Sequence, residues 1–407
     1  MNGSFWTKRN IILLSIGVIV SAIMVGFSIS LILDIDFKNL FTSLKTSLNS
    51  NNLATLWLLL LIGFSLFRAF IFVLLHYVYV KKNKVKTIKW YEWILYAFSL
   101  LFLTASTPFS IGSEPFSVYF LTKHKVNHIR HNSAFLLACS TYYELGQLII
   151  TLPSLFYVSY NIHIFYTALN QPIPYFFWLA VVGTLVDMVI ASLYFVLGYS
   201  SKVHLFINRV YNKIKKVLKL KYDTYEQLLI KHKEGENFKR VYHYYMRLPW
   251  LNITALLIGL GFNFCFYSLT YISYLLVSKD PVLIYFDMFN YTNISITATN
   301  FVPIPGSEGS VQYILKQFLT FNNPHQAKIN DQLINEVIFI WRMFSLYLCA
   351  FVGIFGFSYF LIKDWRIFIK QIKINHKQNN TFLFKNNYRF KWDKKKNDYF
   401  QKKINYN

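Results

Sequence analysis

The feature that most constrains this chain is a series of apolar runs, each long enough to cross a lipid bilayer as a helix. A spanning helix needs about 20 apolar residues, and six runs reach that length, at 11–33, 53–80, 133–158, 175–200, 250–277 and 333–362. Charged residues make up only 15% of the chain, against about 25% in an average soluble domain. The sequence therefore predicts an all-α integral membrane protein with about six spanning helices.

The first run follows a basic start at Lys8 and Arg9. It is longer than the apolar core of a secretory signal peptide, which has about 7–15 residues, and no A-x-A cleavage motif follows it. We expect it to remain as the first membrane span.

Two further apolar stretches, 90–122 and 282–320, are too long for one span. Proline and glycine interrupt each near its middle, in TASTPFSIGSEPF at 104–116 and TNFVPIPGSEGS at 299–310. Such breaks are tolerated at membrane depth only where the backbone is buried in protein or lines a wet cavity.

The positions of Lys and Arg predict which side of the membrane each connection occupies. The segments 1–10, 81–89, 123–131, 202–247 and 363–407 together hold 35 of the 42 basic residues, while 34–50, 159–174, 278–281 and 321–332 hold at most two each. We expect the protein in the plasma membrane, and the positive-inside rule then places the segments rich in Lys and Arg, including both termini, in the cytoplasm. The net charge of +24 then reflects contact with the bilayer, and nucleic acid is not an expected partner.

The same distribution predicts the form of the two broken stretches. The segments on both sides of 90–122 are rich in Lys and Arg, which predicts a re-entrant hairpin that enters from the cytoplasm. The segments on both sides of 282–320 are poor in Lys and Arg, which predicts a hairpin that enters from the outside. A pair of short spans in each stretch would place the flanking segments on the same sides of the membrane, although half of either stretch is short for a span.

The two breaks resemble each other. GSEPFSVYFL at 112–121 and GSEGSVQYIL at 306–315 match at five positions with an offset of 194 residues. Residues 11–158 and 175–362 each contain three spans and one hairpin, in opposite orientation. This pattern predicts an inverted-topology repeat within a polytopic domain at 1–362, with a substrate site where the repeats meet.

Two segments lie outside the predicted spans. The linker 201–249 contains an amphipathic basic stretch at 203–220, which we interpret as a helix on the cytoplasmic leaflet; packing against another part of the protein is the alternative. Residues 363–407 form a basic tail, expected to lie along the membrane or to be disordered.

The Gly-Ser-Glu sequences at the breaks are the strongest candidates for binding. Each is typical of a helix start, with glycine allowing the turn and Ser113 or Ser307 able to cap free N–H groups. Free amides at a helix start favour an anion such as phosphate. The candidate substrate site at the two breaks comprises Pro108, Gly112, Ser113, Glu114, Pro303, Pro305, Gly306, Ser307 and Glu308.

Charged residues within the apolar segments complete the candidate site. Glu114 and Glu308 are expected in the first helical turns, where capping, cation binding and proton transfer are all open roles. Arg68 and Arg342 each need a carboxylate, a phosphate or carbonyl oxygens. The carboxylates available to pair with them are Glu114, Glu144, Asp187 and Glu308.

The histidines and cysteines give weaker signals. His76, His124, His128 and His131 fall near cytoplasmic span ends and are expected to be solvated. Cys139, Cys265 and Cys349 each lie in an apolar run, which predicts small buried side chains. No catalytic, metal or cofactor motif appears, so no cofactor or metal is expected.

Two longer motifs resemble a known family. STPFSIGSEPFSVYFL at 106–121 and FVPIPGSEGSVQYIL at 301–315 are similar to two boxes of the lysylphosphatidylglycerol synthase transmembrane region, the flippase domain of the multiple peptide resistance factor and its stand-alone relatives. YYELGQL at 142–148 and WRMFSLYL at 341–348 resemble its Glu- and Arg-containing spans. Gln312 stands where the second box usually has Glu, and Ser117 or Tyr119 replaces an Arg of the first box, so the headgroup preference is open.

The resemblance implies a flippase-type lipid transporter for an anionic or aminoacylated phospholipid. The aminoacyl-transferase domain of bifunctional family members is too large for the last 45 residues, so lipid lysylation is not expected. An intramembrane lipid-modifying transferase and a non-catalytic partner of a lipid or glycan pathway are the alternatives. Self-association and a separate lipid-modifying enzyme as partner stay open.

Overall fold

The computed structural model describes residues 37–50, 53–85, 88–107, 112–168, 170, 172–217, 224–278, 283–301, 305–321 and 331–365, and every regular element in these ranges is helical. The elements are α2 (Phe37–Ser50), α3 (Ala54–Lys82), α4 (Trp90–Ser106), α5 (Ser113–Lys123), α6 (Ile129–Ala168), α7 (Tyr175–Tyr199), α8 (Ser201–Val217), α9 (Tyr225–Met246), α10 (Pro249–Val277), α11 (Tyr285–Thr297), the 3₁₀ turn η2 (Pro305–Ser307), α12 (Ser310–Phe321), α13 (Asp331–Arg342) and the π-helix η3 (Met343–Tyr347). The last helix continues to Trp365.

The chain forms two compact units. One is Gly17–Phe357, and the other combines Met1–Ile16 with Ser358–Asn407. The elements from α2 to η3 all belong to the first unit. Of the second unit, the structure describes residues 358–365, which end the last helix.

Five helices of the described ranges are long and apolar enough to cross a membrane. They are Ala54–Lys82, Ile129–Ile164, Tyr175–Tyr199, Pro249–Val277 and Asp331–Trp365. The prediction of a helical chain is confirmed for the described residues, and these five helices coincide with five of the predicted spans and are compatible with a place in a membrane. The predicted span at 11–33 lies outside the described residues. The segment 34–50, expected as a connection, contains α2.

The α10 helix is the centre of the packing, because it contacts α3, α6, α11 and α13. Glycines allow its close crossing with α6: a Cβ added at Gly259 would lie 2.9 Å from the Tyr143 carbonyl oxygen, and one at Gly146 would lie 3.1 Å from that of Leu256. Small residues permit such approaches in membrane helices, where van der Waals packing drives association.

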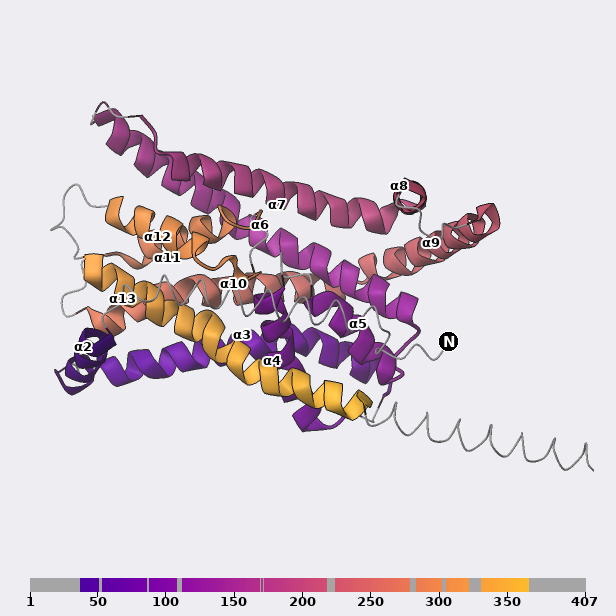
Figure 1. Ribbon diagram of the computed structural model, residues 1–407, viewed down its shortest axis with the longest axis horizontal. Helices are drawn as coiled ribbons and strands as arrows, with labels where there is room; N and C mark the ends of the chain where they lie inside the picture. The colour runs from indigo at the N-terminus through magenta and orange to yellow at the C-terminus, as the bar shows by residue number, and fades with distance from the viewer. Residues whose placement is uncertain are drawn as a thin grey trace, which may run out of the picture. The chain divides into compact units, whose positions relative to one another are not determined.

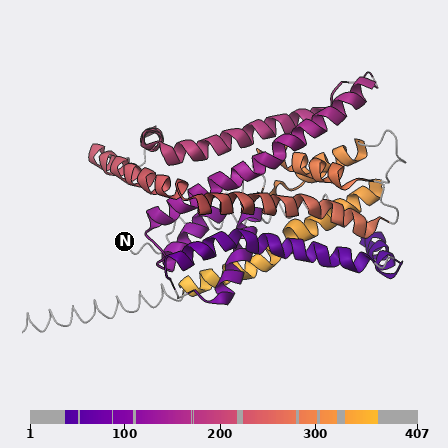
Figure 2. The ribbon, with the colours of Figure 1, turned by 180° about the vertical axis from the view of Figure 1, so that it is seen from behind.

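The basic and the charge-poor connections gather at opposite ends of the long helices (Figures 1 and 2). The connections α3–α4, α5–α6 and α7–α10 lie at one end, on the right in Figure 1. The C-terminal ends of α6, α10 and α12 lie at the other end. The pair α4–α5 lies toward the basic end of the long helices and α11–α12 toward the charge-poor end.

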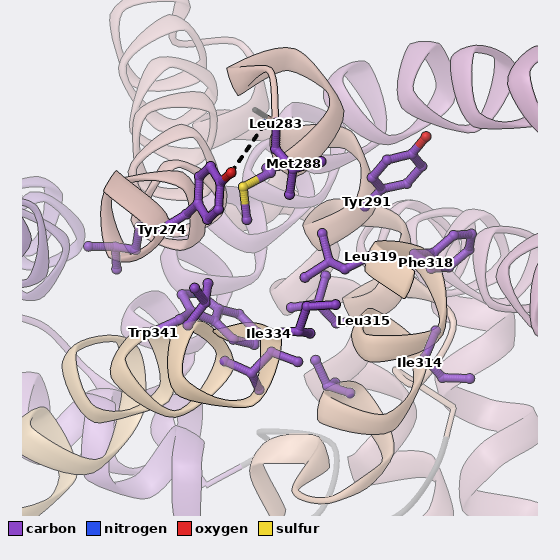
Figure 3. Close-up of a cluster of buried hydrophobic side chains, with 14 of the residues drawn as sticks. Tyr274, Leu283, Met288, Tyr291, Ile314, Leu315, Phe318, Leu319, Ile334 and Trp341 are labelled. Atoms are coloured by element: carbon purple, nitrogen blue, oxygen red, sulfur yellow. Dashed lines mark hydrogen bonds between the residues drawn. The ribbon is translucent and has the colours of Figure 1, made fainter. Parts of the chain in front are cut away.

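A hydrophobic core holds α11, α12, α10 and α13 together at the charge-poor end (Figure 3). Met288 and Tyr291 of α11 face Leu315 and Phe318 of α12, all at most 2% exposed. The Leu283 N–H donates to the Tyr274 hydroxyl at 3.3 Å, which fixes the start of this segment against α10. The second broken stretch is thus embedded in protein.

The linker forms two helices, α8 and α9. Figure 1 shows α8 end-on, so it runs across the direction of α7. The amphipathic stretch places Phe206, Val210, Ile214 and Val217 on one face of α8, and all four side chains are exposed.

Candidate functional site

The first break lies between α4 and α5, and the Thr107 side chain bridges its two described edges. The Gly112 N–H donates to Thr107 Oγ1 at 2.9 Å, and that hydroxyl donates to the Leu103 carbonyl at 2.6 Å. The N-cap of α5 is Gly112, and Ser113 is the first residue of the helix, one position after the N-cap. Pro108 lies outside the described residues.

The second break is held by an unusual backbone. Gly306, Ser307 and Gly309 have φ angles of 62°, 52° and 78°, in the left-handed region. A regular helix cannot pass through such angles, so α12 begins only at Ser310, whose hydroxyl donates to the Ser307 carbonyl at 2.8 Å.

The predicted helix start at the second break needs correction. Glu308 precedes α12 instead of occupying its first turn, and Ser307 does not begin that helix. Glu114, by contrast, lies in the first turn of α5 as predicted. Pro305 begins η2, and Pro303 lies outside the described residues.

The two breaks meet. α4 packs against η2, and a Cβ added at Gly306 would lie 3.4 Å from the Ala105 carbonyl oxygen, one residue before the end of α4. The same Cβ would lie 3.1 Å from the Leu346 side chain in η3. Segments about 200 residues apart in the chain therefore form one junction, which also includes the π-helix.

Arg342 and Glu308 form a buried ion pair at this junction. Arg342 Nε lies 3.8 Å from Glu308 Oε1, and both side chains are less than a tenth exposed. Arg342 also donates to the Gly306 carbonyl at 3.3 Å. Glu308 Oε2 accepts from Gln312 at 2.5 Å and from the Tyr347 hydroxyl at 2.8 Å, so this carboxylate is fixed on three sides.

Arg68 is buried without such a partner. Its side chain is 4% exposed and donates to the Ser345 carbonyl at 2.9 Å. The guanidinium lies over the rings of Phe266, at 4.0 Å, and Phe262, at 4.7 Å. Among the described residues its Nε has no hydrogen-bond partner and no carboxylate forms an ion pair with it.

The π-helix explains why Arg68 finds a carbonyl. A π-helix interrupts the regular hydrogen bonding of an α-helix and is frequent at functional sites. The Ser65 hydroxyl donates to the Phe344 carbonyl and Arg68 to the adjacent Ser345 carbonyl. Phe266 stacks on Trp341, whose ring lies 4.6 Å from the Arg342 guanidinium, so both arginines flank one aromatic pair.

Three carboxylates gather on α5, α6 and α7. Asp187 is 3% exposed and accepts from Gln147 at 3.2 Å and from Asn300 at 3.1 Å. Glu114 accepts from Ser140 at 2.8 Å. Glu144 interacts electrostatically with both Asp187 and Glu114.

Neither Glu144 nor Glu114 has a cationic partner in the described part of the chain. Tyr143 interacts electrostatically with Glu144 and with Arg68. The site therefore has a cationic part at Arg68 and Arg342 and an anionic part at Glu114, Glu144 and Asp187.

A small cavity of about 20 Å³ opens beside Glu114, with Ser113, His76, Cys139 and Tyr143 in its lining. It has room for about one water molecule. Within the described ranges, no three His, Cys, Asp or Glu side chains are grouped as metal ligands.

His76 corrects a prediction. It is 2% exposed, and its Nδ1 lies 3.0 Å from the Tyr96 hydroxyl, because α4 covers this end of α3. His128 and His131 are exposed as expected. The His124 side chain is only 10% exposed and lies 3.7 Å from the Glu92 carboxylate, so its predicted solvation is wrong. All three cysteines are buried and free, which confirms their prediction.

Sequence reasoning missed Gln147 and Asn300, which hold Asp187, and Tyr347, which holds Glu308. A local signal for Gln147 was present, because it follows Glu144 by three residues in the motif YYELGQL, and residues at this spacing are neighbours on one helix face. No local signal marks Asn300 or Tyr347, since their partners come from distant segments.

Comparisons with known proteins find two relatives. "Uncharacterized protein MG306" of Mycoplasma genitalium is 31% identical over 302 residues, covering 72% of this chain and 75% of that protein. "Uncharacterized protein MG306 homolog" of Mycoplasma pneumoniae is 28% identical over 365 residues, covering 86% and 88%. No family model and no solved structure matches the chain.

Proposed function

We propose that this chain, which belongs to the family of the Mycoplasma genitalium protein MG306, is a flippase-type lipid transporter. It would move an anionic or aminoacylated phospholipid headgroup across the plasma membrane, with both chain termini in the cytoplasm. The observation that carries the proposal is Arg68, a buried guanidinium with an unused Nε donor beside the junction of the two breaks.

An unpaired cation at this depth is costly unless a ligand completes its coordination. The guanidinium fork fits phosphate oxygens. The neighbouring Arg342 is already engaged by Glu308 and Gly306, so Arg68 is the better candidate for the first contact with a headgroup phosphate.

The carboxylates extend this argument to the headgroup substituent. Glu114 and Glu144 have no cationic partner among the described residues, and burial of uncompensated anions is unfavourable. A headgroup with phosphate at one end and an ammonium group at the other would satisfy both parts of the site. This arrangement fits an aminoacylated phospholipid and accords with the resemblance to the lysylphosphatidylglycerol synthase transmembrane region.

Helix lengths favour re-entrant hairpins over pairs of short spans. The 17 residues of α4 and the 13 of α11 extend about 26 and 20 Å at 1.5 Å per residue, and α5 and α12 are shorter. The hydrocarbon core is about 30 Å thick. We infer that the hairpins enter from opposite faces and that alternate exposure of their junction moves the headgroup.

The exposed apolar face of α8 supports the predicted position of the linker. Phe206, Val210 and Ile214 are exposed, whereas packing on another part of this chain would cover them. Together with the crosswise course of α8 in Figure 1, this favours a helix on the cytoplasmic leaflet.

Proteoliposomes test the proposal. Wild-type protein should accelerate transbilayer exchange of fluorescent phosphatidylglycerol and its lysyl derivative at least about tenfold over protein-free vesicles. The variant Glu114→Gln/Glu144→Gln should lose exchange of the lysyl lipid selectively, because it removes two of the three carboxylates of the anionic part and leaves Arg68 in place.

Equal exchange with and without protein would overturn the transport proposal. A missing lipid species in extracts from a deletion strain would instead favour an intramembrane transferase. An unchanged set of lipids with an altered leaflet distribution is the result expected for a transporter.

A further inference from the structure

A second charged feature lies away from the junction, on α9. A groove of about 430 Å³ is lined by Glu236, Lys239, Arg240, His243, Tyr244 and Arg247. These residues follow one another at helical spacing along a single face of α9. The opposite face carries the buried Tyr242, Tyr245 and Met246.

The acidic residues near this groove offset part of its positive charge. Glu234 pairs with Arg130 of α6. Glu236 is hydrogen-bonded to Ser201 of α8 and interacts electrostatically with Lys239 and Arg240, so one carboxylate opposes the three cations Lys239, Arg240 and Arg247 that line the groove. Among the described residues no carboxylate forms an ion pair with Arg240 or Arg247. The groove therefore retains an excess of positive charge.

His243 lies in this positively charged groove. Its pKa is lowered below the ordinary value by partial burial and then by the neighbouring charges of Lys239 and Arg247. Its Nε2 is buried and has no hydrogen-bond partner among the described residues, while its ring contacts Tyr199 at 4.3 Å. An anion in the groove would relieve the repulsion and could accept from this nitrogen.

The groove lies at the level expected for lipid headgroups. Arg247 is two residues before Pro249, the first residue of the α10 span. Tyr244 is exposed. Trp250 follows Pro249 in the chain, and the Lys82 ammonium lies 3.1 Å from the centre of the Trp250 ring. Tyrosine and tryptophan at such positions are typical of the membrane–water interface.

The geometry points to a headgroup site on α9 that retains the phosphate of an anionic phospholipid of the adjacent leaflet. Arg240 and Arg247 supply planar donors for phosphate oxygens, and Tyr244 supplies an interfacial ring. Such a lipid would hold the linker at the membrane surface. This site does not require the chain to transport lipid, and it is separate from Arg68.

Binding by purified full-length protein in neutral detergent tests the site. Native mass spectrometry would follow dihexanoyl phosphatidylglycerol, phosphatidylcholine with the same tails, and inorganic phosphate. We expect Arg240→Gln/Arg247→Gln to weaken phosphatidylglycerol binding about tenfold, since interfacial cations attract anionic lipid. The control Lys231→Gln/Lys233→Gln removes the same charge from the same helix and should bind as the wild type does.

Three results would overturn the proposal. They are equal binding by the groove variant and the wild type, equal weakening by the control variant, and inorganic phosphate binding as tightly as phosphatidylglycerol. Because Arg240 and Arg247 are exposed, the groove variant should have the melting temperature of the wild type. Binding should persist in Arg68→Met, which separates this site from the proposed transport site.

Discussion

The two breaks that meet at the junction differ in how they are stabilised. At the second break, three left-handed residues fix the backbone, and Glu308 is held by Arg342, Gln312 and Tyr347. The flanking α11 and α12 belong to the large hydrophobic core of Figure 3. Little in this region can change without breaking several contacts at once.

The first break has fewer constraints among the described residues. Thr107 closes it through one hydrogen bond to Gly112. Glu114 accepts from Ser140 and borders a small cavity. Most of α4 beyond Leu100 is only half-buried.

The two breaks therefore differ in how their charges are paired. At the second break, Glu308 and Arg342 pair with each other. Near the first break, Glu114, Glu144 and Arg68 have no ion-pair partner in the described part of the chain. In the function proposed above, a lipid headgroup would satisfy these charges.

The largest expected difference concerns the two glutamates. Glu308→Gln leaves the buried Arg342 without its carboxylate and should destabilise the protein by about 3 kcal/mol. Glu114→Gln keeps an oxygen for Ser140 and should cost less than about 1 kcal/mol. Unfolding titrations in detergent measure both, and equal losses would contradict the comparison.

The glycines at the breaks provide a second contrast. Gly306→Ala places a Cβ on a left-handed residue beside Leu346 and Ala105, at a cost of about 1–3 kcal/mol. At Gly112 the new Cβ would meet only the movable Thr107 side chain at under 3 Å, and φ is −66°. Thermal melting should show the larger loss at Gly306; the reverse order would mean that the first break is the rigid one.

A smaller effect is expected from the hydrogen bond between Gly112 and Thr107 at the first break. Thr107→Val keeps the shape but leaves the Gly112 N–H unpaired, which should cost about 1 kcal/mol. Thr320→Val is the control, because this exposed hydroxyl bonds only carbonyls of its own helix. Indistinguishable melting curves for the two variants would show that another contact closes the break.

The smallest effect concerns pH at the α9 groove. Since the pKa of His243 is lowered in the empty groove, a bound phosphate should raise it, and linkage then makes binding tighter as pH falls. Burial first, then Lys239 and Arg247, lower that pKa, and the nearby Glu236 stays ionised because its own pKa is lowered. Affinity for phosphatidylglycerol should rise about two- to threefold from pH 8 to pH 6, and His243→Gln should remove the change.

Hydropathy and charge patterns predicted much of this fold. The five described spans have ends within a few residues of the predicted ones, except that α6 extends ten residues past 158. These signals are local or additive along the chain, so one sequence suffices to read them. The re-entrant course of the hairpins stays a prediction.

The site was predicted less completely, because its contacts join distant segments. Four carboxylates were open partners for Arg342, and only the fold selects Glu308. His76 was expected at the surface, but α4 covers it. The π-helix in an otherwise uniform apolar run gave no signal, although it supplies the carbonyl that Arg68 contacts.

Arg68→Met provides the most direct test of the central claim that Arg68 is kept for a ligand. Replacing an unpaired buried cation with an apolar side chain of similar length should raise the melting temperature, while phosphatidylglycerol exchange in proteoliposomes falls to the protein-free rate. The control Arg130→Met removes a half-exposed arginine paired with Glu234 and should leave exchange unchanged. A lower melting temperature for Arg68→Met, or exchange at the wild-type rate, would contradict the account.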